Sequence, residues 1–117
     1  MAGHRIDRIS EDISRELTAI LRTVKDPRVS GTLLTIVRVD VTNDLSYATV
    51  YISSMDGMEQ ARGAVKGLRS AAGYMRRELG RALELRHVPE LRFVPDDSIA
   101  YSTEISRKLN ELSKHND

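Results

Sequence analysis

The chain of 117 residues contains no cysteine and no tryptophan. The absence of cysteine excludes disulfide bonds, thiolate nucleophiles and cysteine metal sites together. It also fits a reducing compartment, and we expect the protein to be cytoplasmic. With one phenylalanine and four tyrosines, the hydrophobic core must be mainly aliphatic.

Long apolar runs are also missing. No stretch approaches the roughly 20 apolar residues of a membrane-spanning helix. The first residues, MAGHRIDRISED, mix charged and apolar side chains and do not resemble a signal peptide. We therefore expect no membrane association. The length predicts a single domain over residues 1–117 that buries a modest core.

The positive charge of the chain is concentrated in one segment. Residues 61–92 hold eight Lys or Arg against three Asp or Glu, a net charge of +5, although the whole chain carries only +1. Residues 31–60 hold one against four, a net charge of −3. This asymmetry indicates a polyanionic partner. A solvated helix face gives the same pattern, and charge alone does not separate the two interpretations.

Hydrophobic periodicity and turn residues predict the order of the secondary-structure elements. We expect a helix over about 6–24, an antiparallel hairpin of strands 32–41 and 46–53, a helical segment over about 59–85, a short strand over 90–94, and a last helix from about 98 with a frayed tail at 113–117. Pro27 ends the first helix. Val29–Gly31 is expected to be a loop.

The central helical segment is predicted to break near its middle. Each interior glycine costs a helix about 1 kcal/mol relative to alanine, and the segment contains four of them. The small residues Ala71, Ala72 and Gly73 would let two helices, about 59–71 and 73–85, meet at an angle through a kink. Gly63 and Gly67 either permit close approach of another backbone or are simply tolerated.

Basic side chains gather on one side of this helical segment. When the segment is wound at about 100° per residue, Arg62, Lys66, Arg69 and Arg76 share a face, and the apolar residues lie away from it. The candidate nucleic-acid contacts are Arg62, Lys66, Arg69, Arg76, Arg77, Arg81, Arg86 and Arg92. Helix-face ion pairs such as Arg81–Glu84 or Arg77–Glu84 would give some of these residues a structural role instead.

Two tyrosines of the second strand share one face. Tyr47 and Tyr51 could stack on bases, as aromatic residues do on the sheets of some RNA-binding modules. Alternatively, they pack against the first or last helix or simply cover the sheet. We favour these structural roles over base stacking, because no aromatic-rich RNA-binding pattern surrounds the two tyrosines.

No constellation of catalytic or metal-binding residues is recognisable. His4, His87 and His115 are scattered and lack the spacing of a metal site or a catalytic triad. Asp96-Asp97 is a carboxylate pair, but its position before the last predicted helix is typical of a cap. No phosphate-binding loop occurs. We therefore expect no enzyme activity, metal or cofactor.

The predicted α+β element order is that of a type II KH domain (α-β-β-α-α-β) with an added C-terminal helix. KH domains bind single-stranded nucleic acid through a GXXG loop; here Ala71-Ala72-Gly73 stands in its place. Four short motifs occur along the chain in a specific order and spacing: Asp26-Pro27-Arg28-Val29, Asp44-Leu45-Ser46-Tyr47-Ala48 with Val50, Arg76-Arg77-Glu78-Leu79, and Val88-Pro89-Glu90-Leu91-Arg92-Phe93 with Asp97-Ser98. With these motifs, the chain resembles the bacterial ribosome-binding factor A family over nearly its whole length.

The resemblance implies a non-catalytic assembly factor that binds free small (30S) ribosomal subunits and 16S rRNA. It implies a role in late rRNA maturation, including processing of the 5′ end, and in growth in the cold. Other assembly factors, including GTPases, are further candidate partners. We expect a monomer, because no long apolar seam is present. Two alternatives remain from the residues themselves: a generic KH-like RNA-binding module and a protein-docking domain.

Overall fold

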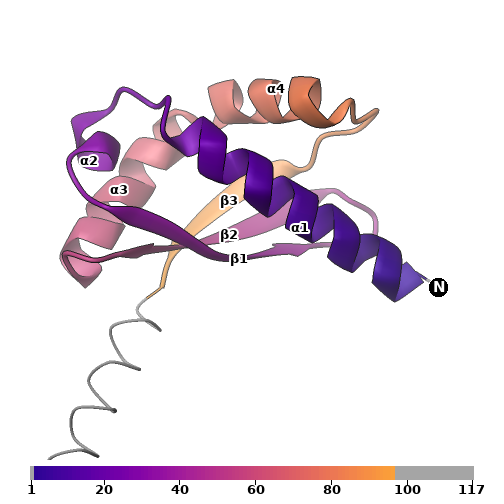
Figure 1. The fold of residues 1–117 in the computed structure, drawn as a ribbon, viewed down its shortest axis with the longest axis horizontal. Helices are drawn as coiled ribbons and strands as arrows, with labels where there is room; N and C mark the ends of the chain where they lie inside the picture. The colour runs from indigo at the N-terminus through magenta and orange to yellow at the C-terminus, as the bar shows by residue number, and fades with distance from the viewer. Residues whose placement is uncertain (1, 97–117) are drawn as a thin grey trace, which may run out of the picture.

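The computed structural model describes residues 2–96, so the predicted last helix and tail lie outside the described residues. The elements are α1 (Ala2–Leu21), α2 (Pro27–Ser30), β1 (Leu34–Val41), β2 (Tyr47–Ser54), α3 (Met58–Ser70), α4 (Ala72–Leu83) and β3 (Glu90–Pro95). Helices α1, α3 and α4 form one layer over one face of the sheet (Figure 1). The predicted α+β class is confirmed, and within residues 2–96 the predicted elements occur in the predicted order, with the unpredicted α2 added between the first helix and the hairpin.

The sheet has three strands in the order β1-β2-β3, with β2 in the centre. Strands β1 and β2 are antiparallel, as predicted, and β3 runs parallel to β2. In the hairpin turn, the Asp44 carboxylate accepts hydrogen bonds from the Ser46 N–H (3.0 Å) and the Thr42 hydroxyl (2.8 Å). These bonds explain why an Asp-containing sequence makes this tight turn.

The inner face of the sheet forms the floor of the core. Ala48, Val50 and Ile52 of β2 are completely buried, as the alternating pattern predicts. Leu91 and Phe93 of β3 are buried beside them. The helix layer contributes the other large core residues, which are Ile13, Leu17, Leu68, Met75 and Leu79.

The expected loop at Val29–Gly31 is wrong, because residues 27–30 form the short helix α2. The Asp26 carboxylate accepts a hydrogen bond from the Arg28 N–H at 2.9 Å, and Pro27 occupies the first helical position. The Arg28 guanidinium also donates to this carboxylate, and these bonds lower the pKa of Asp26 to about 2. Val29, which is 2% exposed, packs into the core.

Only one residue separates α3 from α4. Ala71 has φ −95° and ψ 4°, and its N–H donates to the carbonyls of Gly67 and Leu68, each at 3.1 Å. This junction places α3 over β2 and β3 and places α4 beside α1 (Figure 1). The two helices therefore cover different parts of the core.

Gly67 is explained by the close approach of α2 to α3. A Cβ atom at Gly67 would lie 2.9 Å from Val29 Cγ2 and 3.1 Å from Asp26 Cγ. At Gly63, by contrast, a Cβ would meet no atom of the described residues within 4 Å. Close approach is therefore the reason for glycine at position 67 but not at position 63.

We predict that Gly67→Ala and Gly63→Ala have opposite effects on stability. Gly67→Ala forces α2 and α3 apart and should lower the free energy of unfolding by about 1–3 kcal/mol. Gly63→Ala should raise it by about 0.5–1 kcal/mol, because alanine has the higher helix propensity and meets no neighbour. Urea denaturation followed by circular dichroism measures both. Equal stabilisation by the two substitutions would contradict the packing described here.

Candidate nucleic-acid interface

The structure divides the eight candidate basic residues between two layers. Arg62, Lys66 and Arg69 lie on α3, whereas Arg76, Arg77 and Arg81 lie on α4. Arg86 follows in the connection from α4 to β3. Arg92 lies on β3 between the buried residues Leu91 and Phe93, so it faces the outer side of the sheet, away from the helices. The eight residues do not share one surface.

Two of the arginines tie the helices to the third strand and to the connection that precedes it. Arg69 Nη2 donates to the carbonyl of Phe93 in β3 at 3.2 Å. Arg76 donates to the carbonyl of Val88 from Nε at 3.1 Å and from Nη2 at 2.7 Å. Their guanidinium groups therefore have a structural function, although each keeps further N–H donors for a ligand.

Two other arginines form exposed ion pairs within their helices. Arg62 Nη1 lies 3.2 Å from Glu59 Oε1, and Arg81 Nη1 lies 3.7 Å from Glu78 Oε1. The expected Glu84 partner of Arg81 is thus replaced by Glu78. Exposed pairs of this kind contribute little to stability, so an anionic ligand can compete for the arginines at small cost.

Three basic side chains of the helix layer and its connection have no partner. Lys66, Arg77 and Arg86 are exposed, and no hydrogen bond or ion pair to another part of residues 2–96 engages their charged groups. These residues, which we call the free cations, are immediately available for phosphate oxygens.

The outer face of the sheet carries two arginine–tyrosine pairs. The Arg92 guanidinium lies 3.7 Å from the centre of the Tyr47 ring, and that of Arg38 lies 4.3 Å from the centre of the Tyr51 ring. Both tyrosines thus lie on the sheet surface beneath arginines, as the covering interpretation predicts.

Arg38 was missed by the sequence reasoning. It lies directly opposite Tyr51 in the β1–β2 register, and its Nε lies 3.4 Å from Asp40 Oδ2. The strand alternation could have revealed it, because Arg38 precedes the buried Val39.

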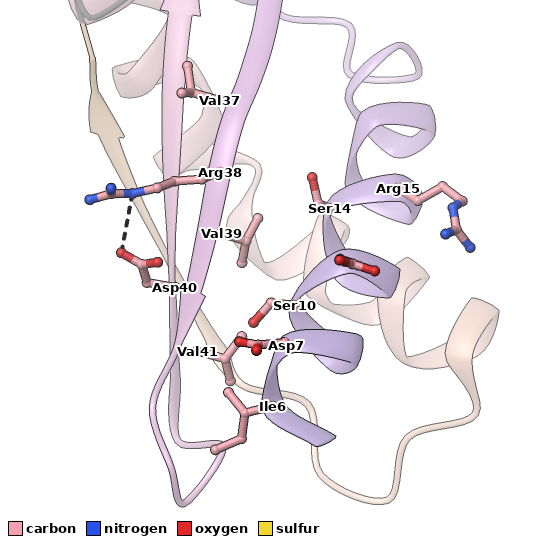
Figure 2. Close-up of a pocket in the computed structure, with 11 residues that line it drawn as sticks. Ile6, Asp7, Ser10, Ser14, Arg15, Val37, Arg38, Val39, Asp40 and Val41 are labelled. Carbon is pink, nitrogen blue, oxygen red and sulfur yellow. Dashed lines mark ion pairs between the residues drawn. The ribbon is translucent and has the colours of Figure 1, made fainter. Parts of the chain in front are cut away.

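A groove of about 700 Å³ separates the first half of α1 from β1. Val39 and Val41 point from the strand towards the helix, whereas Arg38 and Asp40 point away from it (Figure 2). Ser10, Asp7 and Glu11 line the helix side. The groove contains none of the eight candidate residues, and both acidic and basic side chains line it.

The described residues also lack two other kinds of site. No group of three His, Asp or Glu side chains within residues 2–96 could hold a metal ion. No helix in this part of the chain is long and apolar enough to cross a membrane.

The fold and the basic helix layer define a small α+β protein with a surface suited to a polyanion. The family model of ribosome-binding factor A matches residues 5–109. The ribosome-binding factor A of Acetivibrio thermocellus is 47% identical over 113 residues, which cover 96% of this chain and 91% of that protein. The chain therefore belongs to the ribosome-binding factor A family.

Solved structures of this family have the same fold. The crystal structure of the Thermus thermophilus factor is similar with a TM-score of 0.67 at 28% identity, covering 77% of this chain and 94% of that one. A homology model of the T. thermophilus factor, fitted into the cryo-electron microscopy map of its complex with the 30S subunit, is similar with a TM-score of 0.61 at 29% identity, covering 74% of this chain and 89% of that one.

We predict that neighbouring arginines of α4 differ in their effect on stability. Arg76→Ala removes both hydrogen bonds to Val88 and should lower the free energy of unfolding by about 1 kcal/mol. Arg77→Ala makes the same change of residue type one position later but breaks no described contact, so its effect should stay within about 0.5 kcal/mol. Chemical denaturation of the two variants provides the comparison. Equal losses would show that the Arg76 bonds do not hold α4 to the β3 connection.

Proposed function

We propose that this protein is a non-catalytic assembly factor that binds 16S rRNA on free small ribosomal subunits. The observation that carries the proposal is the set of free cations: Lys66 and Arg77 lie on a helix layer that is itself tied to the sheet, and Arg86 lies in the connection from α4 to β3. Contacts from such residues to phosphate position a protein on folded RNA without reading its bases. Membership of the ribosome-binding factor A family supports this choice of RNA.

The arrangement of the helix layer supports recognition by shape and charge. Arg69 holds α3 against β3, and Arg76 holds α4 against the connection before β3. The cations on these two helices therefore have fixed relative positions. The T. thermophilus relative has been fitted into the map of a 30S complex. We further propose a type II KH-like architecture in which Ala71, Ala72 and Gly73 form an interhelical kink in place of the GXXG loop.

The binding energy would favour one conformation of the rRNA over another, which is a population shift rather than a chemical step. We propose that the protein acts in this way late in 16S rRNA maturation, including 5′-end processing, and that its action matters most in cold growth. It would work in the cytoplasm as a monomer, together with other assembly factors such as GTPases. The contacts to rRNA would come from the eight candidate residues, with the free cations making the largest contribution.

Sedimentation with purified 30S subunits tests the proposal. We predict that the wild-type protein co-sediments with free 30S subunits but not with 70S ribosomes, and that binding weakens steeply as salt rises. A Lys66→Glu/Arg77→Glu variant should bind about tenfold more weakly or worse, because two charge-assisted contacts become repulsive. Arg8→Glu/Arg22→Glu, at one exposed position in α1 and one directly after its end, makes the same change in net charge and serves as the control.

The outcomes separate the proposal from its alternatives. Equal binding to 30S subunits, 70S ribosomes and unrelated RNA would indicate a generic RNA-binding module. Binding that does not depend on salt and survives the double reversal would indicate a protein-docking domain. Either result would contradict the proposed function.

A further inference from the structure

A second cleft, of about 510 Å³, opens at the junction of α3 and α4. On the α3 side it is lined by the small residues Gly67, Ser70 and Ala71, and on the opposite side by residues 23–26, which connect α1 to α2. Tyr74, which is 39% exposed, stands at one side. The small side chains leave open space beside the Tyr74 ring, and a flat ring fits such a space.

The Tyr74 ring is held in place from the other side of the cleft. Its hydroxyl lies 2.7 Å from Thr23 Oγ1, and the Thr23 hydroxyl also donates to the carbonyl of Ile20 at 2.6 Å. This chain of hydrogen bonds ties α4 to the end of α1. A ring held in this way can stack on a ligand without first losing conformational freedom.

The charges around the cleft favour a nucleotide over an uncharged aromatic compound. Lys25 lines the cleft, and Lys66 lies one helical turn before Ser70 on α3. Both lysines are exposed, and their ammonium groups have no partner in the part of the chain that the structure describes. A base in the cleft would thus have a cation on either side for its flanking phosphates.

Asp26 gives the cleft a hydrogen-bond acceptor. Arg28 donates two hydrogen bonds to Oδ1 and one to Oδ2, whereas a carboxylate offers about four acceptor sites. One site on Oδ2 is therefore left for a ligand. Because Arg28 lowers the pKa of Asp26 to about 2, the group is ionised at neutral pH and only accepts. The exocyclic amino groups of adenine, cytosine and guanine can donate to it, whereas uracil has no amino group and can donate only through its ring N3–H.

We propose that this cleft receives one unpaired base that carries an amino group, stacked on Tyr74 and hydrogen-bonded to Asp26. The inference rests on the proposed rRNA-binding function and adds a base-selective contact to it. The basic surface would supply most of the affinity, and the cleft would set the position of the RNA through a single extruded nucleotide.

Fluorine NMR of protein labelled with 3-fluorotyrosine tests the proposal at the residue itself. The chain has four tyrosines, and Tyr→Phe variants assign the Tyr74 resonance. The probes are the hexanucleotides rA6, rC6 and rU6. We expect rA6 and rC6 to shift the Tyr74 resonance and to bind several-fold more tightly than rU6. Asp26→Asn keeps a good N-cap residue and should reduce this preference.

A substitution that fills the cleft gives the second measurement. Ser70→Leu should weaken rA6 binding about tenfold, which corresponds to the loss of one base–aromatic stack. Gln60→Leu makes a comparable change at an exposed position of the same helix, away from the cleft, and should leave binding unchanged. Circular dichroism verifies that both variants are folded.

Binding of the wild-type protein to 30S subunits is measured in parallel. This distinguishes a failure of the cleft proposal from a failure of the proposed function. If the protein binds 30S subunits but none of the three hexanucleotides shifts the Tyr74 resonance, the cleft proposal is overturned and the proposed function stands. Equal affinity for rU6 and rA6 would overturn the role of Asp26 and with it the proposal. If the protein binds neither subunits nor RNA, both the proposed function and the inference that rests on it are wrong.

Discussion

The close contact between α2 and α3 at Gly67 is the constraint on which the rest of the structure depends. Because position 67 lacks a side chain, Val29 and Asp26 come within contact distance of the α3 backbone. Helix α3 can then lie against β2 and β3 while the chain leaves it through the single residue Ala71. The position of α4 beside α1 follows from this turn, and so do the cleft at the junction and the placement of the basic residues.

The basic residues have two different roles: some hold the helix layer in place, and others are available to bind phosphate. Arg69 and Arg76 donate hydrogen bonds to the carbonyls of Phe93 and Val88, and these bonds hold the helix layer to β3 and to the connection before it. The charged groups of the free cations Lys66, Arg77 and Arg86 have no such partner within the described residues. A surface of this kind can bind phosphate without reorganising, because its cations stand on elements that other arginines have already fixed. This pre-organisation is what shape recognition of folded RNA requires.

Much of the fold follows from the sequence, because hydrophobic periodicity decides which face of each element is buried. The alternation around Val50 predicted the buried face of β2, and Pro89 predicted the entry into β3. Helix α2 was missed, because four residues are too short to show a period; its signal was the Asp-Pro pair, which is typical of a helix start. The reason for glycine at position 67 could not be decided, because it depends on a contact with a distant segment.

The site was only partly predictable for the same reason. Composition located the positive charge in residues 61–92, but it could not tell which guanidinium groups are engaged by carbonyls or carboxylates. Those partners, such as Val88 for Arg76, come together only in the folded chain. The aromatic pairing of Arg38 and Arg92 depends on strand register in the same way.

The most direct test of the account is the salt dependence of binding to free 30S subunits, for the wild-type protein and for a Lys66→Ala/Arg77→Ala/Arg86→Ala variant. Each phosphate contact that is lost should reduce the slope of log K against log salt concentration by roughly 0.7–0.9. We predict a slope that is smaller by about 2 to 3 for the triple variant. An unchanged slope with unchanged affinity would show that the free cations do not contact the RNA, and it would contradict the central claim.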